Sequence, residues 1–201
     1  MKSEPALLVI AATGMLGFAA YQYINAQQQS DGMSAIGAAL DSAISSATDA
    51  GTSLLEYVGV SMWNYEKVPT QYREAISQAE TANGLPPQML ARLLYQESHY
   101  RPDIISGAKA SPVGALGIAQ FMPATAKDLG LNPLDPLASI AAAGKYLGGL
   151  YKQTGGWDKA LAAYNWGVGN VRRKGLAMAP AETRNYYKQI LADIGLGAVY
   201  A

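Results

Sequence analysis

Glu97 is the residue whose type and position first indicate chemistry. Helical spacing of i, i+3, i+4 and i+7 in the segment LPPQMLARLLYQES puts one acid on an apolar face, formed by Leu90, Leu93, Leu94 and Glu97. Desolvation raises the pKa of a carboxyl group, and a nearby helix C-terminus acts in the same direction. Glu97 is therefore predicted to hold its proton, as general-acid cleavage of a glycosidic bond requires.

Other interpretations of this helix remain open from its sequence alone. Glu97 could end the helix in solvent or pair with Arg92 or Arg101. Ser98 beside His99 suggests a nucleophile and its base, but adjacent helical residues do not face each other. A hydrolase triad is therefore disfavoured.

Three separate segments add polar and aromatic residues to this picture. They are ESHYRPDIISGAKASPVGALGIAQFMPATA from Glu97, AYNWG from Ala163 and ETRNYY from Glu182. In order and content they resemble the lytic transglycosylase family with the lysozyme-like SLT domain, over about Pro69 to Ile194. Because joint occurrence of three motifs by chance is improbable, the resemblance favours the enzymatic interpretation of Glu97.

The resemblance implies roles for residues of the first segment. Glu97, followed by Ser98, would be the single catalytic acid and base. The stretch from Gly117 to Gln120 matches the family's Gly-Leu-Met-Gln motif, so Gln120 and Met122 would line the sugar groove. Ala119 stands where Met is common, and a contact of that Met is not carried over.

The later segments supply the remaining site residues by the same resemblance. Tyr164 and Asn165 match the Ala-Tyr-Asn-Ala-Gly motif, in which Trp166 replaces the second alanine. Tyr164 would lie close to the catalytic glutamate, and Glu182 would support the site from behind. Tyr186 could stack on a sugar, although a core or rim role is favoured for it and for Tyr187.

One family residue has two candidate positions here. The serine that helps to orient the substrate matches Ser111 by its setting in SPVGALG, but Ser106 by its distance from Glu97. Ser111 is preferred, because extra residues before a glycine-rich turn are easily held in a surface loop.

The mechanism implied by the resemblance needs only one carboxyl group from the protein, no metal and no cofactor. Glu97 would protonate the β-1,4 bond between N-acetylmuramic acid and N-acetylglucosamine of peptidoglycan, and a 1,6-anhydro sugar would form. Ordinary glycosidases need two carboxylates. A hydrolytic lysozyme of similar fold, and a non-catalytic wall-binding or virion module, are the alternatives.

Composition excludes several other classes of protein. The 201 residues include no Cys and a single His, which excludes thiol catalysis and the usual zinc sites.

Charge is distributed unevenly along the chain. Residues 1–66 hold one Lys and six acidic residues, for a net charge of −5, whereas residues 67–201 hold 14 basic and nine acidic residues, for a net charge of +5. Arg172, Arg173 and Lys174 form a basic cluster that is either solvated surface or a contact for anionic stem peptides. Without basic runs interleaved with aromatics, nucleic acid is not an expected partner.

The elements that must position these residues are predicted to be helices. Abundant Gly and Ala with only two Phe favour close helix packing and a mostly α domain over residues 69–201. Pro and Gly punctuation predicts helices from Pro69 to Gly84, from Pro86 through Ser98, from Asp135–Pro136 to Gly155, from Trp157 to Asn165, and from Ala181 to Ile194.

Two further regions precede this domain. Residues 1–25 contain an uncharged stretch, 5–24, that is long enough to cross a bilayer, with a cleaved signal peptide as the alternative. Residues 26–68 read as an acidic helical stalk whose apolar stripe over 31–58 needs its own domain, a second copy or another partner to cover it. We therefore expect a chain anchored in a membrane with its catalytic domain in the periplasm or wall space, or one associated with a virion and used for phage entry.

Overall fold

The computed structural model describes residues 63–109 and 111–200, and every regular element in these ranges is a helix. In chain order they are η1 (Tyr65–Lys67), α3 (Thr70–Asn83), α4 (Met89–Ser98), α5 (Pro102–Ile105), α6 (Pro123–Asp128), α7 (Pro136–Thr154), α8 (Trp157–Trp166), α9 (Val168–Lys174), η2 (Leu176–Met178), α10 (Ala181–Asp193) and η3 (Gly197–Val199).

Most of the predicted helix ends are confirmed, because they rest on local capping chemistry. Gly84 ends α3 in the left-handed conformation, where its N–H bonds the carbonyls of Glu80 and Thr81. Asp135 caps α7 by accepting the N–H groups of Leu137 and Ala138. Gly155 closes the same helix.

The predicted start of α4 was wrong by a turn, and the three short α-helices α5, α6 and α9 were not predicted. Gln88 has a φ of 66°, so the chain at Pro86 and Pro87 forms a turn and the helix begins only at Met89. Helices α5 and α6 each carry Pro in the first turn, a position that Pro favours, so Pro102 and Pro123 could have indicated these two helix starts. Gly167 separates α8 from α9, which follows it at once.

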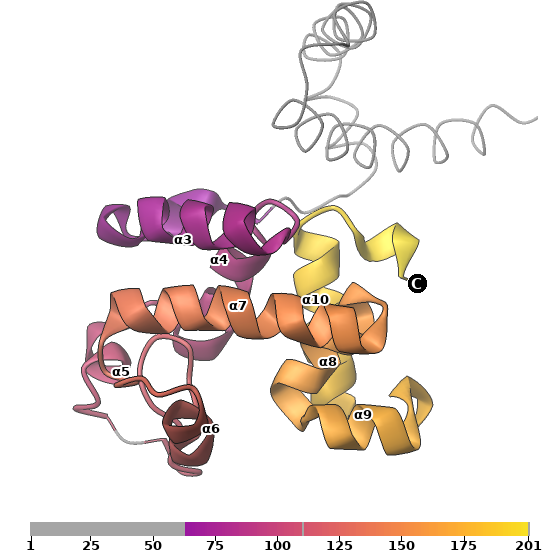
Figure 1. Ribbon diagram of the computed structural model, residues 1–201. Coiled ribbons are helices and arrows are strands. Elements are labelled where there is room, and N and C mark those ends of the chain that lie inside the picture. Colours follow the sequence, from indigo (N-terminus) through magenta and orange to yellow (C-terminus); the bar gives the residue numbers. More distant parts are fainter. Residues whose placement is uncertain (1–62, 110, 201) are drawn as a thin grey trace, which may run out of the picture. The chain divides into compact units, whose positions relative to one another are not determined.

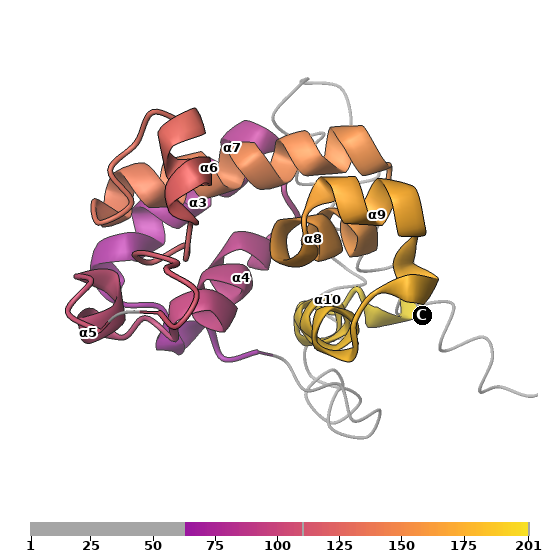
Figure 2. The ribbon, with the colours of Figure 1, turned by 90° about the horizontal axis from the view of Figure 1, so that it is seen from below.

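Helix α7 crosses the domain, with α3 along one side and α8 and α10 beyond its C-terminal half (Figure 1). An added Cβ at Gly144 would lie 3.0 Å from the Cβ of Ala79, and one at Gly148 would lie 3.0 Å from the carbonyl oxygen of Asn83. These glycines let α7 approach α3 closely, as the Gly and Ala content predicts. Figure 2 shows α4 in the middle of the domain, beside α5 on one side and α8 and α10 on the other.

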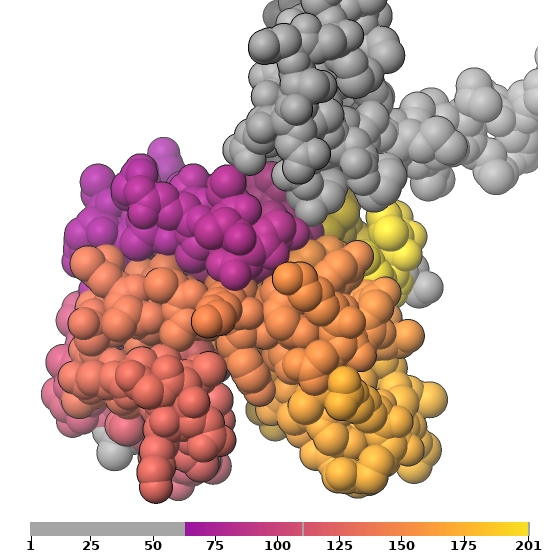
Figure 3. All heavy atoms as spheres, viewed as in Figure 1, coloured from indigo at the N-terminus to yellow at the C-terminus, as the bar shows by residue number. Residues whose placement is uncertain are grey.

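The core gathers around α4. Its Leu90, Leu93 and Leu94 have no exposed surface, and Ile118, Leu147, Leu161 and Ile190 complete the fully buried centre together with other apolar residues. The space-filling view shows the surface hollowed between the lobe that contains α6 and the lobe that contains α9 (Figure 3). The domain is therefore divided by a groove.

Residues 63–68 also belong to the folded unit, although the predicted domain starts at 69. Trp63 is buried, and its backbone N–H donates to the carbonyl of Asp193 at the end of α10. The predicted membrane segment 5–24 and the stripe over 31–58 lie outside the described residues and stay predictions. No helix in the described part is both long and apolar enough to cross a membrane.

Candidate active site

Glu97 lies in the last turn of α4, half-buried at the wall of a polar pocket of about 280 Å³. The other lining residues come from α4, α8 and α10: Gln96, Asn165, Glu182, Asn185, Tyr186 and Gln189. The face of α10 that meets the pocket follows i, i+3, i+4 and i+7 spacing. Sequence reasoning missed Gln96, Asn185 and Gln189, although the spacing of α10 around Glu182 could have indicated the last two.

Burial sets the protonation state of Glu97. Desolvation raises its pKa to about 7, and the hydrogen bond from Tyr186 works in the opposite direction. The Tyr186 hydroxyl donates to Oε1 of Glu97 at 2.5 Å. The carboxyl group is thus poised to exist in either form near neutral pH, which acid and base catalysis by one residue requires.

The two arginines that could have neutralised Glu97 are engaged elsewhere. Arg92 is buried, and its Nε lies 2.7 Å from Oδ2 of Asp193. Arg101 pairs with Asp103 at 2.6 Å on the surface. Glu97 is therefore neither a solvated helix end nor paired with an arginine, the two alternatives that its sequence position left open.

A second buried carboxyl group, Glu80, holds the start of the helix that carries Glu97. From α3 its side chain accepts the N–H groups of Gln88, Leu90 and Ala91 at 3.1, 2.9 and 3.2 Å. These are N–H groups that a helix N-terminus leaves without an intrahelical partner. Desolvation raises the pKa of Glu80 to about 7, while the three hydrogen bonds lower it. The position of Glu80 in the α3 sequence does not indicate that it would accept the N–H groups of another helix.

Tyr164 links α8 to the glycine-rich turn that contains Ala119. Its hydroxyl donates to the carbonyl of Ala119 at 3.0 Å. Burial raises its pKa well above 10, and the charge of Glu97 adds to that shift. This electrostatic coupling fits the expected proximity of Tyr164 to Glu97.

The turn itself depends on a glycine and places two predicted groove residues. Gly117 has a φ of +73°, and a Cβ there would lie 1.8 Å from the carbonyl oxygen of Pro133. Gln120 is also left-handed, and its side-chain amide donates to the Gly117 carbonyl at 2.9 Å. Met122 is exposed. Neither Gln120 nor Met122 lines the pocket of Glu97.

Asn165 and Glu182 both line the pocket with Glu97. The Oδ1 of Asn165 accepts a 2.7 Å hydrogen bond from the buried hydroxyl of Thr183, which fixes the orientation of the amide. Glu182 is exposed in the first turn of α10, and its supporting role behind the site stays a prediction.

Two residues beside Glu97, Ser98 and Tyr186, are buried. Ser98 has no exposed surface; its hydroxyl donates to the Leu94 carbonyl and accepts the N–H of Tyr100, so it fixes the turn after α4. Tyr186 is likewise buried, in keeping with the core or rim role favoured for it, and its hydroxyl donates to Glu97. Tyr187 is buried too, as favoured.

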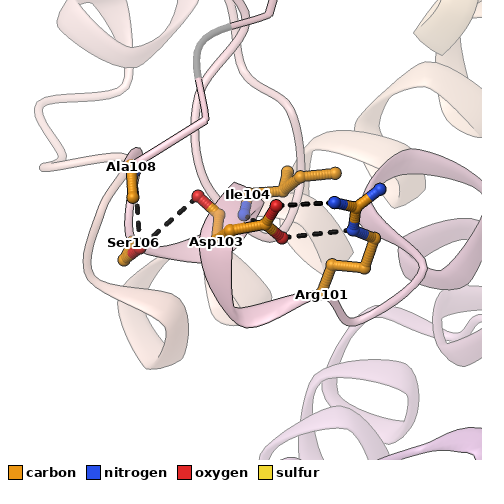
Figure 4. A network of polar contacts seen from close by, with 5 residues as sticks. All are labelled: Arg101, Asp103, Ile104, Ser106 and Ala108. Carbon is orange, nitrogen blue, oxygen red and sulfur yellow. Dashed lines mark hydrogen bonds and ion pairs between the residues drawn. The ribbon is translucent and has the colours of Figure 1, made fainter.

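The two candidate orienting serines lie outside the pocket of Glu97. Ser106 is exposed beside Asp103, whose side chain is occupied by Arg101 and by the N–H of Ile104 (Figure 4). Ser111 is half-buried and accepts the N–H of Val113 at 3.4 Å in the turn before Gly114. The choice between the serines stays a prediction.

Trp166 and the basic cluster of α9 lie outside the residues that line the pocket of Glu97. Trp166 is partly buried against the core, and the Lys174 amine lies 5.4 Å from the centre of its ring. Arg172, Arg173 and Lys174 are exposed in the last turn of α9, where positive charge favours a helix C-terminus.

The fold and the site together define a mostly helical domain, with Glu97 on a central helix facing a polar pocket. The family model described as the transglycosylase SLT domain matches residues 74–187, and the chain belongs to that family. The mostly α, lysozyme-like fold class predicted from the sequence is confirmed by solved structures.

Those structures are lytic transglycosylases. An inactive mutant of lytic transglycosylase Slt from Pseudomonas aeruginosa matches with a TM-score of 0.53 and 26% identity, over 63% of this chain and 24% of that one. The 70 kDa soluble lytic transglycosylase Slt70 from Escherichia coli matches with a TM-score of 0.52 and 28% identity, over 66% and 25%.

Curated relatives come from phages and bacteria. The peptidoglycan transglycosylase gp16 of Escherichia phage T7 is 34% identical over 65% of this chain, and the transglycosylase of Enterobacteria phage PRD1 is 33% identical over 63%. A membrane-bound lytic murein transglycosylase F of Shewanella sediminis is 36% identical over 52%. The chain matches only 11%, 44% and 22% of these relatives' lengths.

Proposed function

We propose that this chain is a peptidoglycan lytic transglycosylase that uses Glu97 as its only catalytic acid and base. The observation that carries the proposal is the Glu97 carboxyl group at a polar pocket, with a pKa raised to about 7 and a hydrogen bond from Tyr186. The names of the relatives and membership of the SLT family support this activity.

The reaction would proceed in two steps. Glu97 first gives its proton to the glycosidic oxygen between N-acetylmuramic acid and N-acetylglucosamine. The C1–O bond breaks, and the acetamido oxygen of the muramoyl residue bonds to C1. The Glu97 carboxylate then removes the proton from the O6 hydroxyl, O6 attacks C1, and the acetamido group leaves. The product is a 1,6-anhydro sugar, and Glu97 regains its proton.

A hydrolytic lysozyme reaction is the second candidate, because Glu182 lines the same pocket as Glu97. A second carboxylate can position a water molecule for attack on C1. The two reactions differ in their products, since hydrolysis leaves a reducing end on muramic acid.

Digestion of purified peptidoglycan, followed by mass spectrometry of the fragments, tests both reactions. We expect 1,6-anhydromuramoyl ends from the unaltered chain and near-complete loss of cleavage in Glu97→Gln. Reducing muramoyl ends alone would replace our proposal with hydrolysis. Unchanged cleavage by Glu97→Gln would overturn Glu97 as the catalytic acid, whereas absence of cleavage by the unaltered chain would leave a non-catalytic wall-binding or virion module as the role of this domain.

We also propose that the chain opens the cell wall locally during phage entry. Two relatives come from phages T7 and PRD1, and the predicted apolar segment 5–24 would tether the domain to a membrane or a virion. Detection of the protein in purified, infectious particles is the expected result. Its absence from particles, with presence in the host envelope, would favour wall remodelling.

A further inference from the structure

Gln96 is a pocket residue whose side-chain orientation is fixed from inside the protein. Its Oε1 accepts a 2.9 Å hydrogen bond from Nη1 of Arg92. A guanidinium group only donates, so the oxygen of the amide must face Arg92 and the NH₂ group must face away from it.

Arg92 is itself held in place, which makes this orientation durable. It is 2% exposed, and its Nε donates to Asp193 at 2.7 Å, from α4 to the end of α10. A buried cation needs such partners, so Arg92 will not readily release Gln96. The series of contacts Asp193–Arg92–Gln96 therefore extends from the end of α10, through the buried Arg92, to the pocket wall beside Glu97.

We infer that Gln96 is a substrate-binding residue, which donates its amide N–H to a carbonyl oxygen of the substrate in the pocket of Glu97. Among the described residues, no protein acceptor is recorded for its NH₂ group, and the residue lines the pocket. Asn165 is oriented in the same way, since its oxygen is taken by Thr183. Two amides, one on α4 and one on α8, thus present donors at the same pocket.

The substrate chemistry that fits is an uncharged carbonyl acceptor. This inference rests on the proposed function, because peptidoglycan carries such carbonyls on its acetamido groups and on its stem peptides. Both a carbonyl oxygen and a sugar hydroxyl have two lone pairs, but the hydroxyl also carries a proton for which the two amide donors offer no acceptor, so the carbonyl is the better match.

Binding to the inactive Glu97→Gln chain tests the inference without turnover. The full 201-residue chain would carry Gln96→Glu, which keeps the acceptor for Arg92 but lacks the donor, or Gln96→Met, which lacks both and adds no charge. The matched controls are Gln153→Glu and Gln153→Met on the exposed surface of α7. Calorimetry would measure the Kd for an oligosaccharide of alternating N-acetylglucosamine and N-acetylmuramic acid, with and without stem peptides.

We expect both Gln96 variants to bind about 3- to 10-fold more weakly, which is the usual effect of losing one neutral hydrogen bond, and the controls to match the reference. Weaker binding of both oligosaccharides assigns the acceptor to an acetamido group; weaker binding of only the peptide-bearing one assigns it to the stem peptide.

An unchanged Kd for Gln96→Glu overturns the inference, whatever Gln96→Met does, because only the bond to Arg92 would then matter. If the unaltered chain still cleaves peptidoglycan in that case, the proposed function stands and only the role of Gln96 falls. Failure of the Glu97→Gln reference to bind either oligosaccharide would overturn the inference, and the proposed function would fall with it only if the unaltered chain also left peptidoglycan uncleaved.

Discussion

The hydroxyl of Tyr186 on α10 donates a 2.5 Å hydrogen bond to Oε1 of Glu97 at the end of α4. Burial favours the protonated form of Glu97, whereas this bond favours the carboxylate. The opposition keeps the pKa near 7, so that the same group can give a proton and take one back.

The first prediction concerns the pH dependence of cleavage. Because the first step needs the protonated acid, kcat/KM should fall as pH rises through about 7, the pKa of Glu97. Initial rates of peptidoglycan solubilisation between about pH 5 and 9 measure this decrease in kcat/KM. A rate that keeps rising through pH 8 would contradict Glu97 as the acid.

Tyr186→Phe should move the fall in kcat/KM to higher pH. Removing the donor withdraws the stabilisation of the carboxylate, so the pKa of Glu97 rises further. Loss of this orienting bond should also lower kcat by about tenfold, as for a charge-assisted hydrogen bond. Tyr187→Phe is the matched control, a buried neighbour on the same helix that should leave the pH profile in place. Identical profiles for the two variants would show that the Tyr186 contact is irrelevant.

Glu80→Ala should destabilise the domain by about 3 kcal/mol, because three N–H groups at the start of α4 lose their buried acceptor. Chemical denaturation provides the measurement. The control, Glu74→Ala, removes an exposed carboxylate from the same helix and should change stability by no more than about 0.5 kcal/mol. Equal effects would mean that Glu80 does not hold α4.

Glu80 should also make stability depend on pH. Its folded-state pKa of about 7 exceeds the ordinary 4.5, so the folded chain keeps a proton that the unfolded chain releases earlier. The contribution of this proton to the free energy of unfolding is full below about pH 4.5 and is lost as pH rises to about 7. The stability difference between the unaltered chain and Glu80→Gln should therefore shift in favour of the variant over that range. A difference that is constant with pH would refute the linkage.

Gly117→Ala should be far more damaging than Gly130→Ala, although both glycines are left-handed. The added Cβ at Gly117 meets the Pro133 carbonyl at 1.8 Å, whereas nothing lies within 4 Å at Gly130. We expect a loss of about 1–2 kcal/mol at Gly130 from backbone strain and of about 3 kcal/mol or more at Gly117 from strain plus overlap. Thermal unfolding compares them, and similar melting temperatures would show that the turn can shift.

The sequence by itself determined the helices that end in capping signals and the helical phase of Glu97. Asp135 and Gly84 form hydrogen bonds with residues only a few positions away, so the helix ends that they cap can be predicted from the sequence. The three motifs also identified the SLT family, and Glu97 was placed on the apolar face where the structure has it.

Only the tertiary structure decided which groups surround that carboxyl. Tyr186 meets Glu97 across 89 residues, and Arg92 reaches Asp193 across 101. Glu80 is the acceptor for a helix to which it does not belong, and Ser98 turned inward although it adjoins Glu97. Such contacts depend on how α3, α4 and α10 pack, and periodicity within one helix specifies a buried face without specifying its neighbours.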